Sequence, residues 1–149
     1  MRLSEHFSLA EMTSSSYATR TNLNNTPPPD VVDNLKRLAA ALEMVRRVLG
    51  HPVIITSGYR SALVNKGIGG SRNSAHVRGL AADFVCPAFG SPLAICQELV
   101  LAGVPFDQMI HEGSWVHFAI PEDGAGARRQ ILTAHFKGGS VSYTTGLPA

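Results

Sequence analysis

The chain has 149 residues, of which 44% are hydrophobic and 16% charged, and its formal net charge is +2. The length is typical of one domain with a sizeable core, and the apolar fraction excludes a disordered chain. The small charge gives no argument for nucleic-acid binding, and no apolar run approaches the ~20 residues that span a bilayer. We therefore expect a single domain over residues 1–149 that acts as a monomer, with neither a nucleic-acid nor a membrane partner.

The first 26 residues are polar, and we expect them to pack on the domain or to extend from it. Ser8 and Glu11 have the spacing of a capping box, which predicts a short helix at that point. Acidic residues and a histidine stand where a secretory signal would need an apolar run, so we expect a protein made in the cytoplasm without a signal peptide.

A long amphipathic helix is predicted after the three prolines that close this polar segment. Apolar residues recur every three or four positions from Val31 to Leu49, so they lie on one face of a helix that Gly50 ends. A second helix is predicted to begin at Pro92, with Ser91 as its N-cap, and to end at Gly103.

Short strands are predicted in the second half of the chain. Residues 52–56 and 79–85 are apolar enough for buried strands. Residues 106–112 and 115–120 are predicted to pair through a two-residue turn in which glycine comes first.

Three further segments complete the prediction. The Gly- and Asn-rich residues 62–74 are expected to form a loop, and the basic stretch 128–136 is a candidate strand. The polar residues after it are expected to be irregular. Helices come early and antiparallel strands come late, which indicates an α+β fold with helices flanking a small antiparallel sheet.

Six histidines raise the question of a metal site. Two imidazoles and one carboxylate are a common ligand set for catalytic zinc, because they leave a fourth position for water. His76, Asp83 and His117 offer such a set. Each histidine is by itself more often an ordinary polar residue, so spacing alone leaves both interpretations open.

The predicted hairpin assigns the side chains near its turn to one or the other face of the sheet. A two-residue turn places Ile110 opposite His117 and Glu112 opposite Trp115, so Glu112 and His117 point to the same face. His111 then points to the other face, with the core. Glu112 is the candidate general base, although a shift of one residue in the turn would invert the assignment.

Several segments in this order resemble the zinc D-alanyl-D-alanine carboxypeptidase family, whose members include phage endolysin peptidases, vancomycin-resistance D,D-dipeptidases and the hedgehog signalling domain. The similarity extends over nearly the whole chain. Members of the small phage and prophage branch begin with a segment like Phe7–Met12. They also carry an Asn-x-Pro motif before the first long helix, similar to Asn25-Thr-Pro27. The segments that carry it are Ser57-Gly-Tyr-Arg-Ser61, Asn65, Gly69-Gly70-Ser71, Ser74-Ala-His-Val-Arg-Gly-Leu-Ala-Ala-Asp-Phe84 and Trp115-Val-His-Phe118.

The resemblance implies a hedgehog/D,D-peptidase fold with one zinc ion per chain, held by His76, Asp83 and His117. It also implies that Arg60 and Ser74 contact the substrate, a peptidoglycan stem peptide. Hydrolysis of that peptide would take place at the cell wall, after release from the cell or as part of a phage particle. Many relatives carry their catalytic acid three residues before the last histidine, where this chain has Ser114.

Alternatives remain for individual residues and for the whole chain. The alternative for Arg60 is a structural role, in which its cation pairs with a nearby acid. The alternative for Ser74 is a hydrogen bond within the loop. Asp107 is expected to have a structural role. Cys86 and Cys96 are expected to be buried free thiols. The alternative to an enzyme is a non-catalytic zinc-containing module that binds peptidoglycan or serves as a structural component of a virion.

Overall fold

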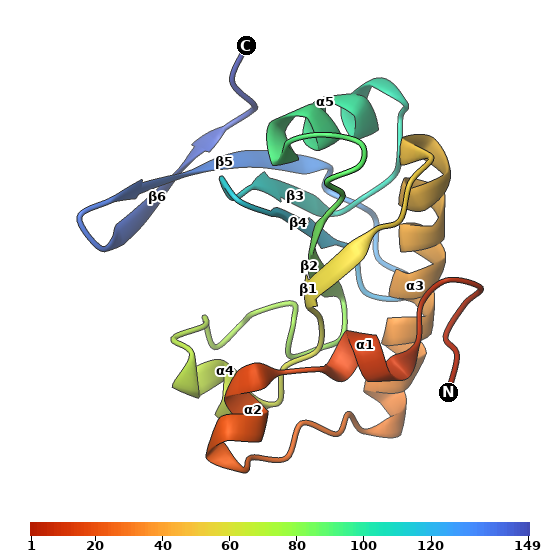
Figure 1. Ribbon diagram of the computed structural model, residues 1–149, viewed down its shortest axis with the longest axis vertical. Coiled ribbons are helices and arrows are strands. Elements are labelled where there is room, and N and C mark those ends of the chain that lie inside the picture. The colour runs from red at the N-terminus through yellow and green to blue at the C-terminus, as the bar shows by residue number, and fades with distance from the viewer.

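The computed structural model describes all 149 residues and has a six-stranded sheet at its centre (Figure 1). The strands are β1 (Ile54–Ser57), β2 (Ala81–Val85), β3 (Gln108–His111), β4 (Val116–Ala119), β5 (Gln130–Lys137) and β6 (Ser140–Thr145). They lie in the order β1-β2-β4-β3-β5-β6, and every neighbouring pair is antiparallel except β3 with β5. The predicted α+β class is confirmed.

Two helices pack with one face of this sheet to form the main core. Helix α3 (Pro29–Leu49) buries the apolar stripe expected of it, from Val31 to Leu49, and ends at Gly50 in the left-handed conformation. Helix α5 (Pro92–Leu101) begins at the expected N-cap. The core contains one side of each central strand, with Phe84, Met109 and Phe118 among its fully buried side chains. The opposite face of the sheet is therefore left for the polar residues of β2, β3 and β4.

The N-terminal segment contributes to the core. Helix α1 (Leu9–Thr13) begins with the predicted capping box, and Phe7 and Met12 are buried in the core. Helix α2 (Ser16–Thr21) was not expected, and it is capped by the Ser15 side chain, which accepts a hydrogen bond from the Ala18 amide.

The predicted hairpin has the expected register. Ile110 faces His117, Gln108 faces Ala119, and Gly113 adopts the positive φ of 82° that such a turn requires. His111 pairs with Val116 and so points away from His117, toward the core side.

Two of the expected irregular segments are regular. Residues 62–67 of the predicted loop form helix α4 (Ala62–Gly67), because Ser61 supplies an N-cap that accepts from the Val64 amide. The last residues form β6 rather than an irregular tail. Gly138 and Gly139, both with positive φ, make the tight turn from β5 into β6, since most other residues avoid that conformation.

The two cysteines are buried and free, as expected, and burial raises the pKa of the Cys96 thiol to about 12. No helix is both long and apolar enough to cross a membrane.

Asn25 ties the N-terminal segment to the chain after β1. Its amide donates to the carbonyls of Thr13 and Tyr59, and its side-chain oxygen accepts from the Ser61 amide. We expect Asn25→Ala to lower the free energy of unfolding by about 2–3 kcal/mol, because it leaves three backbone groups without partners. Asn24 accepts only one local bond, so Asn24→Ala should cost less than about 1 kcal/mol. Equal losses in urea unfolding would contradict this assignment.

Glu43 on α3 holds the first residues of the chain. Its carboxylate accepts from the Ser4 hydroxyl, the His6 amide and the His6 ring at 2.6–2.7 Å. Burial alone would raise the pKa of Glu43, but these hydrogen bonds outweigh it and hold the pKa below the ordinary value.

Ionised Glu43 should therefore stabilise the protein above the ordinary glutamate pKa of about 4.3 and lose this effect as the pH falls through its lowered pKa. We expect Glu43→Gln to cost about 1–2 kcal/mol at pH 7 and progressively less in acid. Asp33→Asn, at an exposed carboxylate of the same helix that has no side-chain partner, is the control. A difference that stays constant down to pH 2 would exclude a contribution from the charge.

Candidate metal centre and active-site cleft

Two of the three candidate ligands face each other across neighbouring strands. Asp83 on β2 and His117 on β4 are direct partners in the antiparallel register, so their side chains leave the same face of the sheet. His117 Nδ1 lies 3.1 Å from Asp83 Oδ1. The sheet itself therefore brings these two residues together, although they are 34 positions apart in the sequence.

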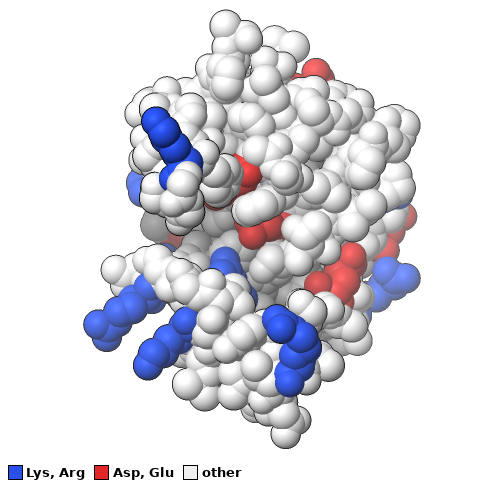
Figure 2. Space-filling view, turned by 60° about the vertical axis from the view of Figure 1, so that its left-hand side comes forward, with Lys and Arg blue, Asp and Glu red and all other residues white.

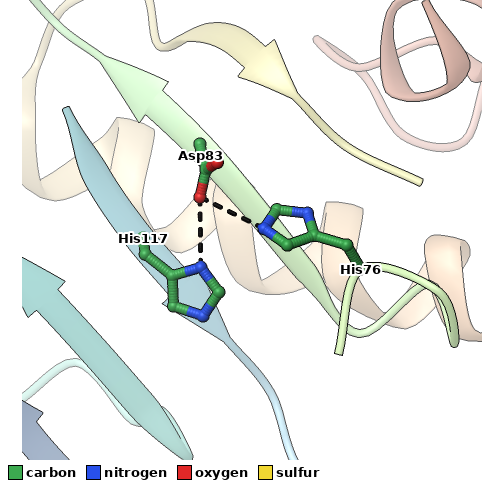
Figure 3. A group of neighbouring side chains, drawn as sticks. All are labelled: His76, Asp83 and His117. Atoms are coloured by element: carbon green, nitrogen blue, oxygen red, sulfur yellow. Dashed lines mark hydrogen bonds and ion pairs between the residues drawn. The ribbon is translucent and has the colours of Figure 1, made fainter. Parts of the chain in front are cut away.

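The third candidate, His76, reaches the same carboxylate from the turn before β2. Its Nε2 lies 3.3 Å from Asp83 Oδ1, and Figure 3 shows both imidazoles directed at Asp83. His76 Nδ1 donates to the Gly58 carbonyl at 2.8 Å, which fixes the tautomer and leaves the Nε2 lone pair facing Asp83.

Burial and pairing set the charges of this cluster. Burial is the main reason that the pKa of His76 is lowered, which favours the neutral ring that a metal requires. Burial alone would raise the pKa of Asp83, but its close contacts with the His117 and His76 rings hold it far below the ordinary value. The cluster thus combines an ionised carboxylate with an imidazole that stays neutral.

The donor set fits a small divalent cation. The three ligand atoms lie within 4.8 Å of one another. Tetrahedral zinc with bonds of 2.0–2.2 Å separates its ligand atoms by roughly 3.4 Å, close to the two nitrogen–oxygen distances in the cluster. Two imidazoles and a carboxylate leave one coordination position for water or substrate, as in a catalytic site.

The cluster lies in a cleft with a volume of about 890 Å³. Figure 2 shows this face hollowed, with acidic side chains inside the hollow and basic side chains around it. In Figure 1 the α4 segment and the β5–β6 hairpin project to the same side of the molecule, one on either side of the cleft-bearing strands.

Arg60 lines the cleft on its β1 side. Its amide donates to the His76 carbonyl, which holds it beside the candidate ligand. The guanidinium forms no ion pair, and its Nε is buried without a hydrogen-bond partner. Burial lowers the pKa of Arg60, while the nearby charge of Asp83 opposes that shift. The structural alternative, a cation paired with an acid, is therefore not what the geometry shows.

Ser74 also lines the cleft, and its hydroxyl oxygen accepts from the His76 amide at 3.2 Å. This is the loop hydrogen bond considered above, but it leaves the hydroxyl proton available to a ligand. The two interpretations of Ser74 are thus compatible.

Glu112 lines the cleft on the β3 side, on the same face as His117. Burial raises its pKa, with the charge of Asp83 adding to the effect and that of His117 opposing it. Its carboxylate makes no hydrogen bond or ion pair, so it is available to a water molecule or a substrate.

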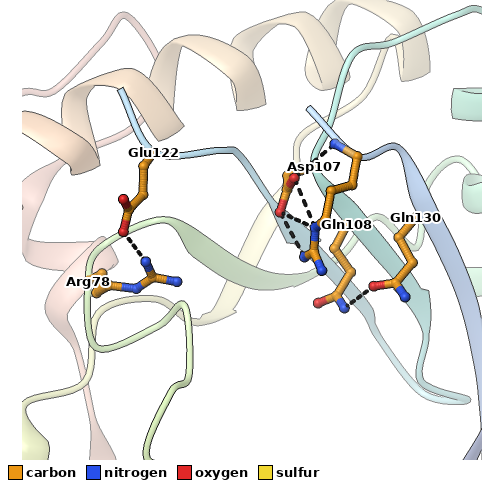
Figure 4. A network of polar contacts seen from close by, with 6 residues as sticks. Arg78, Asp107, Gln108, Glu122 and Gln130 are labelled. Atoms are coloured by element: carbon orange, nitrogen blue, oxygen red, sulfur yellow. Dashed lines mark hydrogen bonds and ion pairs between the residues drawn. The ribbon is translucent and has the colours of Figure 1, made fainter. Parts of the chain in front are cut away.

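Two ion pairs border the end of the cleft away from Glu112 (Figure 4). Asp107 accepts from the Arg128 side chain at 2.8 Å and from the Arg128 amide at 3.0 Å, and these bonds lower the pKa of Asp107. Arg78 pairs with Glu122, and both residues line the cleft. Asp107 is thus saturated by structural contacts.

Among the cleft residues that sequence reasoning did not single out is Tyr143 on β6. The segment was expected to be irregular, so no side-chain direction could be assigned. The Gly138-Gly139 pair between two alternating segments is the signal that could have found the hairpin.

A cleft with two imidazoles, a carboxylate and a free acid beside them is typical of hydrolases that use a single metal ion. A family model described as Peptidase M15 matches residues 5–119. The chain therefore belongs to the peptidase M15 family, as its motifs had indicated, and is a metal-dependent peptidase. No curated protein matches the chain significantly.

The contact between Gly58 and His76 can be tested without touching a ligand. A Cβ at Gly58 would lie 2.3 Å from the Met12 carbonyl oxygen, so Gly58→Ala must displace the backbone that orients His76. We expect at least about tenfold weaker zinc binding in competition with a chromophoric chelator. At Gly90 the nearest atom would be 3.5 Å away, so Gly90→Ala should bind zinc like wild type. Unchanged affinity in Gly58→Ala would show that this carbonyl does not orient the ring.

Proposed function

We propose that the protein is a zinc peptidase that hydrolyses amide bonds in peptidoglycan stem peptides, as a D,D-carboxypeptidase or an endolysin-type endopeptidase. The observation that carries the proposal is the pair of unpartnered groups flanking the cluster. Arg60 follows β1 and Glu112 follows β3, on opposite sides of β2 and β4, which bear Asp83 and His117. A cation and an acid without protein partners, on either side of three metal donors, fit a peptide substrate.

His76, Asp83 and His117 would hold the zinc ion. When bound, the ion polarises the scissile carbonyl and acidifies a water molecule, which supplies the electrophilic part of the chemistry. Glu112 then accepts the proton of the attacking water and delivers it to the leaving amine. Its half-buried position suits this role, because partial burial weakens its preference for the charged form and so makes it a better proton acceptor at neutral pH.

Arg60 would bind a carboxylate of the substrate. Its planar guanidinium can hold a carboxylate through two hydrogen bonds, and a stem peptide ends in a carboxylate and carries others along its length. The loop that contributes Ser71, Asn73 and Ser74 to the cleft would contact the rest of the peptide. This supports stem peptide rather than an uncharged substrate.

Action on the cell wall after release from the cell, or within a phage particle, forms part of the same proposal. It rests on the resemblance to the phage and prophage branch described above. The proposed partner is the stem peptide alone, with the protein acting as a monomer.

Glu112→Gln tests the base. We expect this variant to bind zinc like wild type and to lose hydrolysis by at least about 100-fold, because general-base catalysis contributes that much. Glu5→Gln neutralises an exposed carboxylate elsewhere and should stay fully active. The measurement is mass spectrometry of muropeptides after digestion of purified peptidoglycan, with metal content determined on the same samples.

The same digestion separates the proposal from its alternatives. A chelator should abolish product formation, and zinc should restore it. Products from Glu112→Gln at the wild-type rate would remove Glu112 as the base. A zinc-loaded wild type that binds peptidoglycan and releases no product would instead identify a binding module.

A further inference from the structure

The β5–β6 hairpin adds a wall to the cleft that lies outside the family match. The match ends at residue 119, whereas β5 and β6 follow it. The hairpin joins the rest of the sheet through parallel pairing of β5 with β3, the strand that leads into Glu112. Membership of the family therefore says nothing about the residues of this wall.

The register places Tyr143 in a row with Glu112. In the parallel pair, His111 faces Thr133, so Glu112, one residue further along, lies opposite Ala134. In the next pair, Ala134 faces Tyr143. Glu112 just after β3, Ala134 on β5 and Tyr143 on β6 consequently lie side by side, with their side chains on the cleft face of the sheet.

The small side chain between them lets the two long ones meet. Strands are spaced by about 4.8 Å, so the backbones of Glu112 and Tyr143 are roughly 10 Å apart, within the combined reach of a tyrosine and a glutamate. Ala134 is only 8% exposed, although it lies on an outer strand. Both long side chains line the same cleft.

The Tyr143 hydroxyl is available for a ligand. It has no hydrogen-bond partner within the protein, and the residue is 48% exposed. Burial and the negative charges of Glu112 and Asp83 raise its pKa, so the phenol keeps its proton and remains a donor. The charged groups that shift its pKa are thus the two carboxylates of the cleft.

We propose that Tyr143 is a substrate-binding residue, whose hydroxyl, held over Ala134 beside Glu112, donates a hydrogen bond to the peptide being cleaved. The peptide would then be held from two sides, by Arg60 on the β1 side and by Tyr143 on the β6 side. The inference rests on the proposed peptidase activity and adds a recognition element from beyond the family match.

Tyr143→Phe is the test, because it removes the hydroxyl and keeps the ring. On soluble stem peptides prepared from purified peptidoglycan, we expect kcat/KM to fall about tenfold, the effect of losing one hydrogen bond to substrate. Zinc content and urea unfolding should match wild type, since the hydroxyl has no partner in the protein. Ser142→Ala, on the opposite face of the same strand, should leave kcat/KM unchanged.

A binding measurement separates substrate contact from a general effect. We expect calorimetry with the same stem peptides to show about tenfold weaker binding to the double variant Glu112→Gln/Tyr143→Phe than to Glu112→Gln alone. If wild type cleaves the peptides and Tyr143→Phe cleaves and binds them equally well, the inference about Tyr143 is wrong and the proposed function stands. If the zinc-loaded wild type neither cleaves nor binds them, the proposed function fails and the inference falls with it.

Discussion

The short segment from Gly58 to Ser61 is the constraint on which the site depends. Five hydrogen bonds hold it: two to His76, two to Asn25 and one to the Met12 carbonyl. The same segment therefore orients a metal-site imidazole, carries Arg60 and joins both to the N-terminal helices. Because Gly58 packs directly on the Met12 backbone, the segment has little room to move. The polar N-terminus is in this way part of the scaffold of the cleft.

The charged residues of the cleft are paired at one end and unpaired beside the metal cluster, a difference that stability alone does not explain. Asp107 and Glu122 at one end are each matched by an arginine. Arg60 and Glu112, next to the metal cluster, have no such partners although both are partly buried. A buried polar group without a partner costs free energy, and a folded protein keeps such groups mainly where they serve a ligand. The contrast between the paired residues at one end and the unpaired Arg60 and Glu112 supports the proposal that the substrate binds beside the metal cluster.

The sequence predicted those parts of the fold in which a local pattern and the tertiary structure agree. The apolar stripe of α3 needs only a core to face, and the Gly113 turn fixes the pairing of β3 with β4. That register follows from the turn alone, and it puts Glu112 and His117 on one face of the sheet. The contact between His76 and Asp83 could be predicted only from the resemblance of the motif. Spacing alone does not tell whether a turn folds back over a strand.

Other parts depend on contacts that a linear reading does not contain. The parallel pairing of β3 with β5 joins segments whose order along the chain suggested only antiparallel neighbours. Helix α4 was obscured by the glycines that follow it, although Ser61 is a good N-cap residue. The failure to predict β6 had the largest consequence. The position of Tyr143 beside Glu112 follows only when the registers of both β3 with β5 and β5 with β6 are known. That the Arg60 guanidinium lacks an acidic partner is likewise a property of the three-dimensional arrangement.

The first proposal to test is that His76, Asp83 and His117 bind one zinc ion. X-ray absorption spectroscopy at the zinc edge, on protein loaded with one equivalent, tests it most directly. We expect nitrogen and oxygen ligands at about 2.0–2.2 Å, with the signature of two imidazoles, one of which is lost in His76→Ala. A sulfur ligand at about 2.3 Å, which would implicate Cys86 or Cys96, or a spectrum unchanged in His76→Ala would contradict it.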